Sequence, residues 1–420
     1  MTTQKTGRLR RLLSTCGPGI VSGAADDDPS GIGTYSIAGA QFGTAFLWTA
    51  LLTWPLMAVV QMTCARIGMV TGRGLMAGLR QRFPRWALLG VALALFLANT
   101  FNVGADLAAM GEAGTLLVPA VPAGVWVFVC GIGITWATIE IAYANIARVL
   151  EGLALVLFAY VITAALVVTD WGAVLRAAVT PRIPGGGWAT LVAILGTTIS
   201  PYLFFWQASE EVEEEKARGR RFRRQRTGAT ARELADRRLD VASGAFFSEL
   251  VMFFIILTTA VTLHEHGVTS VRTGAEAARA LRPLAGRFAE LLYALGIFGT
   301  GLLAIPTLTA SAAYAAAEIF GWRQGLSQPF RRARAFYGVV ILATVAGIAL
   351  QWVGLDPLHA LFYSAVVNGV LAPLLLAAIL VVARDATLMQ GQPSPRVALV
   401  VLGAATLLMG AGVVVMFATL

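Results

Sequence analysis

The chain has 420 residues, of which 57% are hydrophobic and 13% are charged. Soluble domains carry roughly 25% charged residues, so this composition excludes a water-soluble protein and predicts that lipid covers much of the surface. The formal net charge of +9 would suit a nucleic-acid partner, but the placement of the basic residues, described below, has a simpler explanation in a membrane.

Eleven apolar runs are long enough for membrane-spanning helices, which need about 20 apolar residues each. No run shows the alternation of a β-barrel strand, so the sequence predicts an all-α integral membrane protein with eleven transmembrane helices. The runs cover residues 17–42, 44–65, 87–116, 123–141, 146–169, 188–207, 242–263, 287–318, 336–352, 357–383 and 396–419.

The basic residues favour one orientation of these helices. With the N-terminal tail (residues 1–16) in the cytoplasm, 26 of the 32 Lys and Arg residues fall in inside segments and six in outside segments. Cytoplasmic loops carry an excess of Lys and Arg, so we expect a cell (inner) membrane protein with a cytoplasmic N-terminus and an outside C-terminus. Residues 208–240 then form a basic cytoplasmic loop that fixes the topology and touches anionic lipid head groups.

The first apolar run contains an acidic interruption. Asp26, Asp27 and Asp28 stand directly before Pro29, which removes a backbone donor and disfavours helix at the preceding residue. Gly31 loosens the next turn. Carboxylates within a hydrophobic span are costly and usually mark function. Unwound backbone beside a carboxylate suits a hard cation, so Asp28 is the best ligand candidate, with Asp26 and Asp27 as candidate pathway residues.

The sixth run is interrupted in an equivalent place, at Ser200 and Pro201. The carbonyl of Thr197 and the hydroxyls of Thr198 and Ser200 are candidate oxygen ligands, and Tyr202 either lines the pathway or packs as an ordinary aromatic residue. Two interrupted spans five helices apart are typical of an inverted-repeat transporter. The alternative for each proline is a simple helix kink.

This pattern divides the chain into two repeats of five spans. We expect the first repeat over residues 17–169, the second over residues 188–383, and an additional eleventh helix over residues 396–419. An odd number of spans per repeat turns the second unit upside down relative to the first.

Polar residues also mark the third, seventh and tenth spans. Asn99, Asn102 and Asp106 recur at intervals of three and four, on one helix face. Asp106 is a candidate proton acceptor or gate residue, with a structural ion pair as the alternative. Asn368 is a polar residue within the tenth span and a candidate for the ion pathway. Glu249 is expected at the membrane interface.

These features together resemble the Nramp family of divalent metal transporters, which share the LeuT-type fold. The resemblance covers most of the chain and rests on Gly17-Pro18-Gly19, Asp28-Pro29, ADLA at 105–108, the Pro201 break, GLLAIP at 301–306 and Pro373. It implies a LeuT-type 5+5 inverted repeat with discontinuous helices 1 and 6. It also implies a secondary transporter that imports a divalent metal ion as its substrate by alternating access, with no resident cofactor.

The helix 1 motif of the family, Asp-Pro-Gly-Asn, here reads Asp28-Pro29-Ser30-Gly31. The resemblance therefore carries Asp28 over as a metal ligand and puts Gly31 at the position of a ligand asparagine. In helix 3 the family's aspartate matches Asp106, which keeps protons as a candidate coupling ion.

The helix 6 motif of the family, Met-Pro-His, here reads Ser200-Pro201-Tyr202. The sulfur ligand and the histidine associated with proton handling are both absent, while the family's backbone-carbonyl ligand falls on Thr197. Sulfur favours late transition metals over calcium and magnesium, so an all-oxygen site suits Mg²⁺ and Mn²⁺, with Fe²⁺ also in range. The chain is similar in this respect to a branch of Nramp-related magnesium transporters.

Three other classes of protein are weaker alternatives. An amino acid or other organic-solute transporter would pair a helix N-terminus with a substrate carboxylate, which the three aspartates would repel. A channel would differ in transport that does not saturate. A membrane enzyme would need a catalytic motif, and the sequence has neither HExxH nor a nucleophile elbow.

Overall fold

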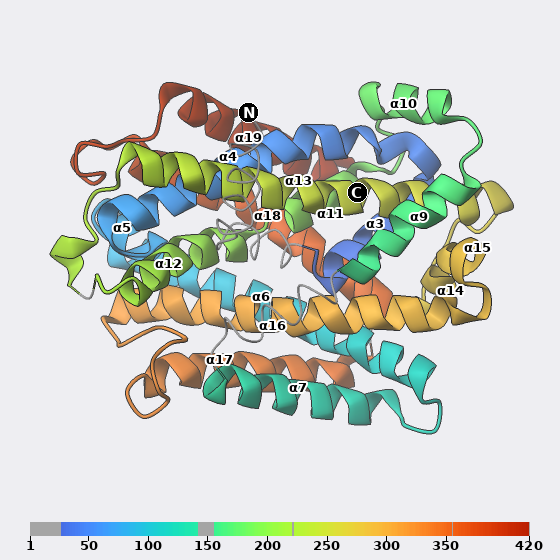
Figure 1. Cartoon of the computed structure of the whole chain (residues 1–420), viewed down its shortest axis with the longest axis horizontal. Helices are drawn as coiled ribbons and strands as arrows, with labels where there is room; N and C mark the ends of the chain where they lie inside the picture. Colours follow the sequence, from blue (N-terminus) through green and yellow to red (C-terminus); the bar gives the residue numbers. More distant parts are fainter. Residues whose placement is uncertain (1–26, 142–154, 221, 355, 420) are drawn as a thin grey trace, which may run out of the picture.

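The computed structural model describes residues 27–141, 155–220, 222–354 and 356–419. Within these ranges every regular element is helical, and most of the long helices run along one common direction (Figure 1). Nine helical segments of the described residues are long and apolar enough to cross a membrane. The prediction of an all-helical membrane protein is therefore confirmed.

Twelve helices form the body of the described structure. They are α3 (Pro29–Phe42), α4 (Trp48–Thr71), α6 (Arg85–Leu117), α7 (Ala123–Glu140), α9 (Phe158–Val167), α11 (Trp188–Thr198), α12 (Pro201–Ala217), α13 (Ala231–Thr262), α16 (Ala289–Phe320), α17 (Arg334–Ala349), α18 (Pro357–Ala383) and α19 (Arg396–Thr419). Shorter helices lie at the two ends of the bundle (Figure 1): α5 (Leu75–Leu79) at one end, and α10 (Trp171–Val179), α14 (Gly274–Ala278) and α15 (Arg282–Ala285) at the other.

The two expected interruptions fall at helix boundaries. Helix α3 begins at Pro29, and the extended Asp28 caps it. Helix α11 ends at Thr198, and α12 begins at Pro201 after an extended Ser200. Both prolines occupy the first helical position, where the missing N–H costs nothing. The segment before the first interruption, with Asp26, lies outside the described residues.

The structure corrects the expectation of a loop over residues 208–240. Helices α12 and α13 both extend into this stretch, and only residues 218–230 connect them. The charged side chains pair along and between the two helices: Arg237 lies 2.8 Å from Glu211 and 2.5 Å from Asp240. Such pairs support helix in a segment that has no apolar run.

Helix packing follows the same pattern in the two halves of the chain. Helix α3 packs on α13, and α12 packs on α4; helix α6 packs on α7, and α16 packs on α17. Helix α11 approaches α18 closely, since a Cβ added at Gly196 would lie 2.1 Å from the carbonyl oxygen of Ala365. The last turn of α11 is therefore fixed against α18, directly before the break.

Candidate functional site

Asp28 is a buried carboxylate held at the start of α3. Its side chain is 1% exposed. Oδ1 accepts hydrogen bonds from the backbone N–H of Gly31 at 2.8 Å and from the hydroxyl of Ser30 at 2.5 Å. The cap is the local reason for this position, because a helix start leaves N–H groups without partners and an aspartate can satisfy them.

A hydrogen-bonded chain links Asp28 to two further helices. Asn102 on α6 donates from Nδ2 to Asp28 Oδ2 at 3.0 Å. Ser364 on α18 in turn donates to Asn102 Oδ1 at 2.6 Å. Because the Asn102 amide bonds to Asp28 through Nδ2 and to Ser364 through Oδ1, it fixes the orientation of the Asp28 carboxylate.

The last turn of α11 faces this carboxylate. The hydroxyl oxygens of Ser30 and Thr197 are 3.4 Å apart. A Cβ added at Gly31 would lie 3.4 Å from the same Thr197 hydroxyl, so Gly31 lies beside Thr197. The structure thus brings Asp28, Gly31 and Thr197 together.

Ser200 contacts the backbone of the last turn of α11. Its hydroxyl donates to the carbonyl oxygens of Gly196 and Thr197, both at 2.7 Å. These carbonyls belong to the C-terminal turn of α11, which carries the negative end of the helix dipole. The break therefore carries several carbonyl and hydroxyl oxygens, of which the Thr197 hydroxyl lies on the side of Ser30 and Asp28.

Asp106 is the second carboxylate of this region. It lies fully buried on α6, one turn beyond Asn102, and neither of its carboxylate oxygens has a hydrogen-bond partner among the described residues. Two buried carboxylates in one region are stable only when a cation or a proton offsets their charge. The arrangement can therefore hold a cation, and it disfavours an anion.

Asp27 and Glu249 form a second pair of acidic residues. It is buried, accepts a hydrogen bond from Ser248 on α13 at 3.2 Å, and interacts with the neighbouring Glu249. Glu249 is 3% exposed and accepts a hydrogen bond from Thr53 on α4 at 2.7 Å. Glu249 is thus buried between α13 and α4, and its place at the membrane interface stays a prediction.

Three other predicted pathway residues are also buried. The Thr198 hydroxyl donates to the carbonyl of Ile194, one turn back along α11. Tyr202 is fully buried at the start of α12. Asn368 lies one turn beyond Ser364 on α18, and neither of its amide atoms has a hydrogen-bond partner among the described residues.

Sequence reasoning missed three polar residues around the break. Ser30 and Ser364 bond directly to the Asp28–Asn102 pair. Gln61 on α4 is buried beside Ser200 in a small cavity, and its amide has no partner among the described residues. Gln61 carries a sequence signal, because an amide within an apolar span is unusual; the serines carry none, since hydroxyls are common in such spans.

The site differs from a protein metal centre with several charged ligands. Among the residues that the structure describes, no group of three or more His, Cys, Asp or Glu side chains could hold a metal ion. The oxygens near Asp28 come instead from hydroxyl groups and from the backbone. Such a mixed oxygen set suits hard divalent cations and leaves few charges to hold an ion permanently.

Curated relatives match much of the chain. A divalent metal cation transporter MntH of Yersinia pestis is 28% identical over 304 residues, which cover 70% of this chain and 70% of the relative. An MntH of Deinococcus radiodurans is 28% identical over 316 residues, covering 70% of this chain and 66% of the relative.

Solved structures share the fold. The manganese transporter of Eremococcus coleocola, in complex with an aromatic bis-isothiourea compound, superposes with a TM-score of 0.71 at 16% identity and covers 98% of this chain and 87% of that one. Mhp1, a nucleobase-cation-symport-1 family transporter, gives a TM-score of 0.51 at 14% identity and covers 95% and 92%. These likenesses agree with the LeuT-type fold that the resemblance implied.

One family model spans nearly the whole sequence. The model described as "Natural resistance-associated macrophage protein-like" matches residues 19–419. The chain therefore belongs to the Nramp family of membrane transporters, and it is not an enzyme.

Proposed function

We propose that this chain is a secondary transporter that imports divalent metal cations by alternating access, with the metal ion as its substrate. The observation that carries the proposal is the buried Asp28, which faces the C-terminal turn of α11 across the two helix breaks. Its curated relatives are named divalent metal cation transporters, and a structure of the same fold is named a manganese transporter.

The proposed binding step follows from the charges on the two sides of the break. Asp28 supplies the full negative charge, while the carbonyl of Thr197 and the hydroxyl of Ser200 supply neutral oxygens. Gly31 leaves room beside Thr197, where a larger side chain would fill the space. Because a break of this kind lies between two half-helices that can move relative to each other, it can open to either side of the membrane in turn.

We further propose an all-oxygen site that takes Mn²⁺ or Mg²⁺, with Fe²⁺ also in range. Ser200 supplies a hard oxygen where a thioether would favour softer ions. We propose on this basis that the chain belongs to a divergent branch of the family that lacks the helix 6 Met-Pro-His motif. For coupling, Asp106 is the candidate proton carrier, since it is buried beside Asp28 and has no cationic partner among the described residues.

The finer topology is also a proposal: eleven spans, two inverted repeats over residues 17–169 and 188–383, and a helix outside them at 396–419. The matched packing of α3 on α13 and of α12 on α4 supports the repeat. The excess of Lys and Arg in the segments at one side supports a cytoplasmic N-terminus and an outside C-terminus in the cell (inner) membrane.

Uptake into proteoliposomes tests the function. We expect purified protein to drive saturable uptake of Mn²⁺ and Mg²⁺, and Asp28→Ala to abolish it. Asp236→Asn is a matched control, because this carboxylate lies at the exposed end of α13. Equal uptake by wild type and Asp28→Ala would overturn the assignment of Asp28. Amino acid uptake without any metal uptake would favour the organic-solute transporter instead.

A further inference from the structure

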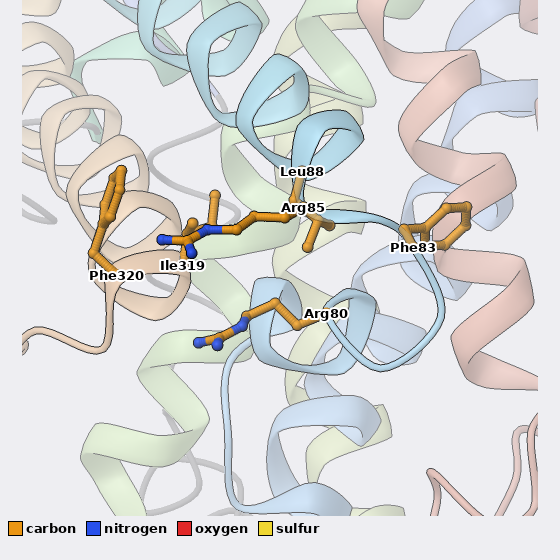
Figure 2. Close-up of a pocket in the computed structure, with 6 residues that line it drawn as sticks. All are labelled: Arg80, Phe83, Arg85, Leu88, Ile319 and Phe320. Atoms are coloured by element: carbon orange, nitrogen blue, oxygen red, sulfur yellow. The ribbon is translucent and has the colours of Figure 1, made fainter.

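A half-enclosed pocket of about 300 Å³ lies at the bundle end that carries α5. Figure 2 shows its lining: Arg80, Phe83, Arg85, Leu88, Ile319 and Phe320. The residues come from the α5–α6 connection, the first turn of α6 and the last turn of α16. The pocket is thus far along the bundle from the breaks, and the proposed metal site does not use it.

Two guanidinium groups share this pocket without a carboxylate. Arg80 and Arg85 point in the same direction, toward the last turn of α16 (Figure 2). Arg80 donates to the backbone carbonyl of Glu318 at 2.7 Å. Neither arginine forms an ion pair within the described part of the chain, whereas the neighbouring Arg82 pairs with Asp385. Two like charges that face one pocket with no carboxylate in its lining favour an anion there.

The local backbone adds to the positive potential. Arg85 is the first residue of α6, a helix of 33 residues, and Pro84 precedes it without a side-chain cap. The N-terminus of a helix carries a partial positive charge and free N–H groups, both of which favour an anion such as a phosphate. Together with the paired guanidinium groups, it makes the pocket suited to a phosphate group.

The exposed residues next to the pocket indicate that the phosphate group belongs to a lipid. Trp86 is 77% exposed, directly beside Arg85, and it starts the apolar part of α6. Leu89, Leu93 and Leu97 continue from it along the helix as exposed residues at successive turns. An exposed tryptophan at the end of an apolar span marks the membrane–water interface, so the pocket opens at the depth of lipid head groups, with an apolar stripe for an acyl chain below it.

We propose that this pocket binds the phosphate head group of an anionic phospholipid. Arg80 and Arg85 contact the phosphate, and the stripe of Trp86, Leu89, Leu93 and Leu97 contacts the acyl chain. In the orientation proposed above the pocket faces the cytoplasmic leaflet, where anionic lipids attract basic residues. The lipid would join α16 to α6, the helix that carries Asn102.

Native mass spectrometry of the full chain in detergent tests the proposal. Phosphatidylglycerol and phosphatidylcholine are titrated against wild type, Arg80→Gln, Arg85→Gln and Arg331→Gln, the last an exposed control arginine in the loop before α17. We expect each pocket variant to weaken phosphatidylglycerol binding about 5-fold, the factor for one basic residue at an anionic surface. The control and Arg85→Lys should keep wild-type affinity, which separates loss of charge from misfolding.

Competition with millimolar inorganic phosphate distinguishes a lipid head group from a free phosphate ion as the ligand of the pocket. A lipid site should keep phosphatidylglycerol bound, because the acyl contacts are absent from the free ion. Complete displacement would instead assign the pocket to a soluble phosphate. Unchanged affinity in both Arg80→Gln and Arg85→Gln, or equal binding of phosphatidylcholine, would overturn the proposal.

Discussion

The contact between α11 and α18 makes Gly196→Ala the most informative substitution next to the break. An added Cβ would lie 2.1 Å from the carbonyl oxygen of Ala365 and 2.3 Å from the backbone nitrogen of Gly369. Both obstacles are backbone atoms within a helix, so no side-chain rotation relieves them. Because non-bonded atoms prefer separations of about 3.5 Å, the two helices must move apart by roughly 1 Å.

The expected cost lies at the upper end for overpacked interiors, about 3 kcal/mol. The same displacement changes the position of Thr197, the next residue, relative to Asp28. We therefore expect a lower melting temperature in detergent and, in the protein that remains folded, weaker Mn²⁺ uptake. Gly403→Ala is the control, because a Cβ there meets nothing within 4 Å and alanine favours helix over glycine.

Thermal unfolding and uptake into proteoliposomes, measured for both variants, test the predicted effect of Gly196→Ala. The account predicts a drop of several degrees and reduced uptake for Gly196→Ala alone. If Gly196→Ala matched Gly403→Ala in both measurements, the close approach of α11 to α18 would be wrong, and so would its role in holding the break.

Three further predictions concern the ligands and the bundle end. Asn102→Leu removes a hydrogen bond to the Asp28 carboxylate worth about 1.5–3 kcal/mol, so the Mn²⁺ concentration for half-maximal uptake should rise roughly tenfold or more; an unchanged value would contradict the orienting role. Ser200→Met should raise uptake of Mn²⁺ and Fe²⁺ relative to Mg²⁺ in a competition assay, because sulfur favours late transition metals, and an unaltered ion preference would remove Ser200 from the ligand set. The backbone N–H of Leu388 lowers the pKa of Asp385 below its ordinary value of 3.8. Stabilisation by Asp385 is thus complete above that value and is lost as the pH falls through the lowered pKa, so Asp385→Asn should reduce the loss of stability on acidification, and identical acid unfolding curves would contradict this.

The helix breaks could be predicted because proline and adjacent carboxylates leave an unmistakable local signal. Pro29 and Pro201 fix the helix starts whatever the surrounding fold. The spacing of Asn102 and Asp106 likewise placed both on one face of α6, and the structure turns that face toward Asp28.

The remaining contacts depend on tertiary packing that local patterns do not encode. Ser30 and Ser364 look like ordinary hydroxyls until α3, α6 and α18 meet. The hydrogen bond from Thr53 to Glu249 likewise forms only where α4 meets α13. Ion pairs between α12 and α13, such as Arg237 with Glu211, extend both helices beyond their apolar runs.

The central claim is that a divalent cation binds between Asp28 and the last turn of α11. Crystals of the full chain grown with Mn²⁺ and measured for anomalous scattering test it directly. The account predicts a peak about 2.0–2.6 Å from an Asp28 carboxylate oxygen, beside an oxygen of Thr197, and its loss in Asp28→Ala. A Mn²⁺ peak elsewhere in the bundle, or one that persists in Asp28→Ala, would contradict it.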